Sequence, residues 1–138
     1  MRLIVLLMAM SFLLTAKVMA NDQQAQVNYM LNCQGCHTPD GSGFPDKGVP
    51  SLKGFMGKFL RVPGGREFLI QVPGAAQSTL NSAQLAEMTN WMLTTFDPES
   101  MTADFLPYST LEVEALRSKK LIAVGAVRAA LVEGIRAL

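Results

Sequence analysis

Two cysteines and one histidine stand together in this sequence, and it contains no other cysteine or histidine. They form the run Cys33-Gln34-Gly35-Cys36-His37. Two thiols three positions apart can form thioether bonds to the two vinyl groups on one edge of a porphyrin, and the next residue can then bring its imidazole to the iron. The spacing therefore indicates one covalently bound haem c, with Cys33 and Cys36 as attachment points and His37 as an axial iron ligand.

Three other chemistries use similar residues. A structural zinc site generally has four protein ligands, and this chain offers three such side chains unless another chain contributes. A thiol–disulfide exchanger needs a buried strand before the motif, whereas the stretch from Asp22 to Leu31 is polar and helical in character. A plain structural disulfide is the third alternative. We favour haem attachment over all three.

Residues 1–20 are typical of a secretory signal. Arg2 gives a positive start, an apolar run extends from Leu3 to Leu14, and Val18-Met19-Ala20 forms a small-residue cleavage site. The run is shorter than the roughly 20 residues of a spanning helix, so we expect cleavage, export to the periplasm and no stable membrane span afterwards. Loss of Arg2 and Lys17 leaves 10 basic and 11 acidic residues. Without a basic surface, nucleic acid is not an expected partner.

The rest of the pattern predicts helices and turns, with few strand signals. Asp22 can cap an N-terminal helix that runs into the motif. Asn81 and Gln84 begin a helix that continues to Thr95, and Ser109 with Glu112 forms a capping box that opens another. Apolar residues three or four apart predict a further amphipathic helix over residues 121–138. We expect an all-α fold, with one domain over residues 21–118 and a helical extension over residues 119–138 that packs on it.

Several segments resemble the class I c-type cytochromes, which are small monohaem electron carriers. Tyr29 stands four residues before the first cysteine, as an aromatic does in that family, and a turn-rich loop follows His37. The segment from Val49 to Lys58 is similar to the family's G-P-x-L-x-G-x-x-G-[RK], with Val49 in place of the usual glycine. The resemblance covers most of the mature chain and implies a cytochrome c-like helical haem domain. It also implies that the Pro50 carbonyl accepts a hydrogen bond from Nδ1 of His37, which makes the ring a better iron donor.

The second axial ligand is a methionine, another group or none, because the chain has no second histidine. The methionines of the mature chain are Met30, Met56, Met88, Met92 and Met101. Met30 lies on the helix that enters the motif, and Met88 and Met92 fit core packing on a helix. Met56 aligns with a packing residue of the family. In the family, the ligand methionine is followed by a short turn and then by the final helix. Met101 resembles that methionine because it stands in the same order before a predicted helix. We therefore predict Met101 as the ligand, with Met56 or an empty position as alternatives.

Three side chains are candidates for binding the haem propionates, as positive or indole donors do in relatives. Arg61 and Arg66 flank a Pro-Gly-Gly turn, and Trp91 is the single tryptophan. Solvated surface charge is the alternative for the two arginines, and core packing is the alternative for Trp91.

These residues together predict an electron carrier rather than an enzyme. A His/Met pair favours fast electron transfer and raises the reduction potential relative to two histidines. We expect single electrons to pass from a dehydrogenase or reductase to an oxidase in the periplasm. An open axial position would instead allow peroxidase-like or gas-binding chemistry. A third possibility is an obligate electron-transfer subunit of a dehydrogenase that recognises its partner through residues 121–138.

Overall fold

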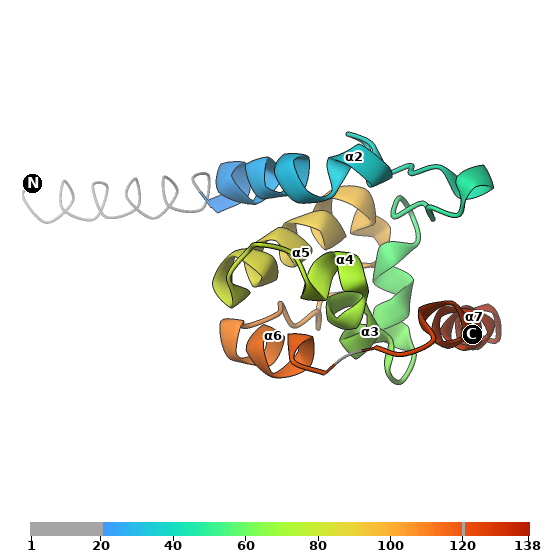
Figure 1. The fold of residues 1–138 in the computed structure, drawn as a ribbon. Coiled ribbons are helices and arrows are strands. Elements are labelled where there is room, and N and C mark those ends of the chain that lie inside the picture. Colours follow the sequence, from blue (N-terminus) through green and yellow to red (C-terminus); the bar gives the residue numbers. More distant parts are fainter. Residues whose placement is uncertain (1–20, 120) are drawn as a thin grey trace, which may run out of the picture.

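The computed structural model describes residues 21–119 and 121–138 (Figure 1). The signal sequence predicted at residues 1–20 lies outside these residues. Within the described part no strand forms, and one isolated antiparallel bridge joins Phe44 and Val49. None of the helices described there is long and apolar enough to cross a membrane. The all-α prediction is confirmed.

The chain is helical over residues 21–32 and passes through a turn at Cys33 into the short helix α2 (Gln34–His37). The other described elements follow in chain order: η1 (Pro45–Lys47), η2 (Met56–Arg61), α3 (Gly65–Gln71), α4 (Pro73–Ala76), α5 (Ser82–Phe96), η3 (Pro98–Ser100), α6 (Thr110–Arg117) and α7 (Val124–Arg136).

Helix α5 begins at the capping box that the sequence predicts. The Asn81 side chain accepts from the Gln84 N–H at 2.9 Å, and the Gln84 side chain accepts from the Asn81 N–H at 3.0 Å. These two bonds satisfy donors that the first helical turn would leave unpaired. The helix ends at Phe96, just before Pro98, which cannot continue it. The capping box predicted at Asn81 and Gln84 is therefore confirmed.

The core forms where α5 meets α6 and where α3 meets α6 and η2. Its largest fully buried side chains are Tyr29, Ile70, Leu85, Met88, Leu93, Asp97 and Val113. Because Tyr29 belongs to the helix that enters the cysteine motif, this core fixes the motif relative to α5.

Helix α7 lies at the edge of the molecule, where it contacts η2 (Figure 1). Gly134 faces Val62, and Leu131 lies near Gly64. None of the residues of α7 is buried. The additional C-terminal helix is confirmed, although it begins at Val124 and not at residue 121, because Ala123 before it adopts a left-handed backbone conformation.

Candidate haem site

The two cysteines and the histidine are placed by helical hydrogen bonds on both sides of the turn at Cys33. The Cys33 N–H donates to the Tyr29 carbonyl at 2.9 Å, and the His37 N–H donates to the Cys33 carbonyl at 2.9 Å. Both cysteines are free; Cys33 is half-buried and Cys36 is exposed. Burial, and secondarily the charge of Cys36, raises the pKa of the Cys33 thiol to about 11. Neither thiol is engaged in a disulfide, so both are free to bond to a common group.

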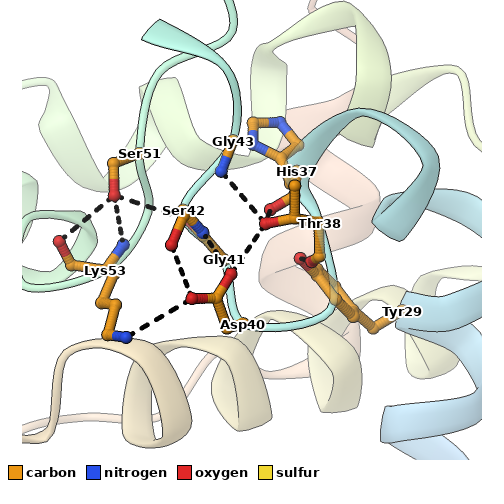
Figure 2. A network of polar contacts seen from close by, with 9 residues as sticks. All are labelled: Tyr29, His37, Thr38, Asp40, Gly41, Ser42, Gly43, Ser51 and Lys53. Carbon is orange, nitrogen blue, oxygen red and sulfur yellow. Dashed lines mark hydrogen bonds and ion pairs between the residues drawn. The ribbon is translucent and has the colours of Figure 1, made fainter.

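The loop after His37 is held by the Asp40 carboxylate (Figure 2). It accepts from the Ser42 hydroxyl at 2.6 Å, from the Thr38 hydroxyl at 2.8 Å and from the Ser42 N–H at 3.2 Å. Lys53 forms an ion pair with it at 3.5 Å. These bonds, the Ser42 hydroxyl first, lower the pKa of Asp40, so the carboxylate stays ionised at neutral pH. The network gives the turn-rich loop one defined shape.

Gly43 brings this loop against the Val49–Pro50 backbone. Its φ is +63°, and a Cβ at this position would lie 2.7 Å from the Pro50 carbonyl oxygen and 2.8 Å from that of Val49. The Gly43 N–H donates to the His37 carbonyl at 3.0 Å. Only glycine fits this close approach. The position of Pro50 beside His37 therefore depends on Gly43.

Two opposing effects act on the His37 ring. Burial of the ring lowers the pKa of His37 and is the larger effect. The Pro50 carbonyl, as a hydrogen-bond acceptor for the protonated ring, raises that pKa by a smaller amount. Nδ1 of His37 is buried, and it makes no hydrogen bond of standard geometry in the structure. The carbonyl of Pro50 is thus the nearby acceptor that this nitrogen needs, and its role as the orienting group of His37 stays a prediction.

A cavity of about 390 Å³ adjoins the motif. It is lined by Asn32, Cys33, Cys36, His37, Gly48, Val49, Pro50, Leu52, Met56, Leu69, Val72, Gly74, Ala75, Met88, Thr89 and Met92. Its volume falls in the range of cofactor sites, about 300 to 1,000 Å³. The lining is mostly apolar and contains no Asp, Glu, Lys or Arg. Two free thiols, one imidazole and apolar walls are the donor set and surroundings that a covalently attached haem needs.

Three methionines line this cavity, and Met101 is not among them. The sulfur of Met88 lies 4.0 Å from the sulfur of Cys33. Met101 is half-buried, and its terminal methyl lies against Gly57, where an added Cβ would come within 2.5 Å of it. Met30 is 52% exposed. The structure therefore brings His37 together with Met56, Met88 and Met92 around one cavity, while Met101 packs on the neighbouring core.

Two curated proteins are similar in sequence to this chain. Cytochrome c-552 of Thermus thermophilus is 30% identical over 107 aligned residues, which cover 64% of this chain and 81% of the relative. A second cytochrome c-552, from a named strain of the same organism, is 30% identical over 107 residues, which cover 72% of that relative. The chain belongs to the monohaem c-type cytochrome family. No protein-family model and no solved structure matches it.

Membership of this family implies haem c as the cofactor of this cytochrome, and Cys33 and Cys36 are the one cysteine pair in the chain. The alignment also shows a difference from the relatives. Because 64% of 138 residues is fewer than 107, the relatives have positions within the aligned region that this cytochrome lacks.

Arg66 lies outside the cavity lining, in a cluster with Glu112 and Tyr108. Its guanidinium donates to both carboxylate oxygens of Glu112, at 2.6 and 2.8 Å, and stacks 4.0 Å from the centre of the Tyr108 ring. The Glu112 side chain therefore does not complete the predicted capping box, and Ser109 alone caps α6 by accepting from the Glu112 N–H. The exposed Arg61 shares a surface hollow with Arg66 and does not line the cavity either.

Trp91 packs in the aromatic core of the cytochrome. Its ring centre lies 5.6 Å from that of Tyr29 and 5.5 Å from that of Phe96. Such tilted contacts are the packing that aromatic side chains prefer. Trp91 is not among the residues that line the cavity. Its predicted contact with a propionate, like those of the two arginines, stays a prediction.

The sequence reasoning missed one wall of the cavity. This wall is formed by Leu69 of α3, by Val72 between α3 and α4, and by Gly74 and Ala75 of α4. The only signal for this wall in the sequence is an apolar stretch that ends at Pro73, and such a stretch fits any buried helix. Nothing in the pattern shows that it faces a cofactor.

Proposed function

We propose that this cytochrome carries single electrons in the periplasm, from a dehydrogenase or reductase to an oxidase. The observation that carries the proposal is the convergence of Cys33, Cys36 and His37 on one apolar cavity without charged side chains. Haem bound there supplies a one-electron iron couple. Cys36 is exposed, so the attachment edge lies at the surface, where a partner protein can approach.

The chain's own residues have distinct roles in this proposal. Cys33 and Cys36 hold the cofactor covalently, so that it is not lost outside the cell. His37 provides the axial nitrogen, and Pro50 orients its ring and increases its basicity. The apolar walls, such as Leu52, exclude water, and exclusion of water reduces the solvent rearrangement that accompanies each change of charge.

A potentiometric titration of the purified haem-containing protein tests electron carriage. The absorbance should change reversibly in one step, with a tenfold change in the ratio of oxidised to reduced protein for every ~59 mV. The same sample should exchange electrons with both a small reductant and a small oxidant without consuming any other substrate. An irreversible step, or the absence of any redox change within the working range, would reject the proposal.

The periplasmic location rests on residues 1–20, and it has its own test. The N-terminal residue of the protein recovered from the periplasm of a host should be Asn21. Recovery of a chain that begins at Met1 and is confined to the membrane fraction would show that the segment anchors the protein and is not removed.

A further inference from the structure

The α3–α4 wall of the haem cavity offers no group that binds iron. The residues that line it are Leu69, Val72, Gly74 and Ala75. Residues 69–86 as a whole contain no His, Met, Cys, Lys or Tyr. A side chain from this segment therefore cannot supply the sulfur, nitrogen or phenolate oxygen that usually completes the coordination of a haem iron.

The cavity methionines belong to other walls. Met88 lies 4.0 Å from the Cys33 sulfur, so it is at the attachment edge, whereas the iron of a bound porphyrin is at the centre. Met92 follows one helical turn later on the same face of α5. The Met56 N–H donates to the Leu52 carbonyl at 2.9 Å, which ties Met56 to the segment that contains Pro50. The Pro50 carbonyl packs against Gly43, whose N–H donates to the His37 carbonyl at 3.0 Å.

Met101 is held away from this space by a buried polar contact. The Asp97 carboxylate is 2% exposed and accepts from the Gly57 N–H at 2.8 Å. This bond fixes the α5–η3 turn against η2, and the Met101 methyl then packs on Gly57. Bringing Met101 into the cavity would require this turn to leave η2. The buried Gly57 N–H would then lose its acceptor, which costs free energy.

We propose that the chain leaves the second axial position of the haem iron open, and that the α3–α4 wall receives a small neutral molecule such as carbon monoxide or nitric oxide. The inference rests on the proposed haem attachment and goes beyond electron carriage. The wall formed by Leu69, Val72 and Ala75 is aliphatic, and the cavity contains no Lys, Arg, Asp or Glu. A small apolar ligand is compatible with such a wall, whereas an anion would find no positively charged side chain there.

Spectra of the intact haem-containing protein test this inference. The ferric protein should be high-spin and lack the near-infrared methionine-to-iron band, and the ferrous protein should bind one carbon monoxide per haem. Met101→Ala should keep these spectra and bind carbon monoxide within about twofold of the parent, because Met101 lies outside the cavity lining and its removal takes away no ligand. Ala75→Leu should weaken carbon monoxide binding at least about tenfold by narrowing the wall.

The opposite result is equally specific. A low-spin protein with a methionine-to-iron band that Met101→Ala, Met56→Ala or Met92→Ala abolishes, and that does not bind carbon monoxide, would overturn the inference and identify the ligand. A mass measurement that confirms covalent haem in each variant excludes loss of fold or cofactor as the cause. The redox titration of the same samples separates this outcome from a failure of electron carriage, because a six-coordinate haem would still titrate reversibly.

Discussion

Substitution of Gly43 by alanine should destabilise the protein through one identifiable contact. Its left-handed backbone, with φ of +63°, costs an L-residue about 1–2 kcal/mol. The added Cβ would also lie 2.7 Å from the Pro50 carbonyl oxygen and 2.8 Å from that of Val49. Both atoms belong to the backbone, so no side-chain rotation relieves the clash, and the required shift adds about 1–3 kcal/mol. The expected loss for Gly43→Ala is therefore about 2–5 kcal/mol.

Gly54→Ala is the matched control. Its φ is +64°, but a Cβ there would meet nothing within 4 Å, so only the conformational cost of about 1–2 kcal/mol applies. The free energy of unfolding of both variants is measured by urea titration. Gly43→Ala should also raise the reduction potential of the haem, because displacement of Pro50 makes His37 a weaker electron donor to the iron. Equal unfolding free energies for the two variants would refute the steric argument.

Three further expectations follow from buried or paired polar groups. Asp97→Ala should cost about 1–3 kcal/mol in urea unfolding, since it leaves the buried Gly57 N–H unpaired, and Asp97→Asn should cost less. The hydrogen bond from Arg66 lowers the pKa of Glu112 in the folded protein. The ionised Glu112 therefore stabilises the fold fully above the ordinary glutamate pKa of about 4.3, and this stabilisation is lost as the pH falls through the lowered pKa of the folded protein. The stability difference between the parent and Glu112→Gln should therefore shrink from pH 7 to pH 3, and a constant difference would contradict it. Burial raises the pKa of Tyr29 to about 12, and its hydroxyl donates to a backbone carbonyl of the loop in Figure 2; Tyr29→Phe should thus cost about 1 kcal/mol at any pH from 5 to 9.

Local signals in the sequence predict much of this molecule. The Cys33–His37 motif depends on neighbours within five positions, and the Asn81 cap depends on a residue three positions away. Both act within one helical turn, so chain connectivity brings their partners together. The all-α fold and the final helix follow from the same kind of local periodicity.

Contacts between distant segments could not be predicted in this way. Arg66 and Glu112 are 46 positions apart, and their pairing depends on how α3 packs on α6. The position of Met101 depends likewise on the buried Asp97 that ties its turn to η2. The sequence shows a methionine on a loop in the expected order, but the direction in which that loop packs is decided by the whole core. The α3–α4 wall could not be recognised for the same reason.

The central claim is that Cys33, Cys36 and His37 form a site of covalent haem attachment. The most direct test is the mass of the intact chain, produced in a host that attaches haem to exported proteins and measured after denaturation. We predict the mass of residues 21–138 plus one haem, reduced to the mass of the bare chain when both cysteines are replaced by alanine. A parent protein that loses all haem on denaturation, or never gains it, would contradict the claim.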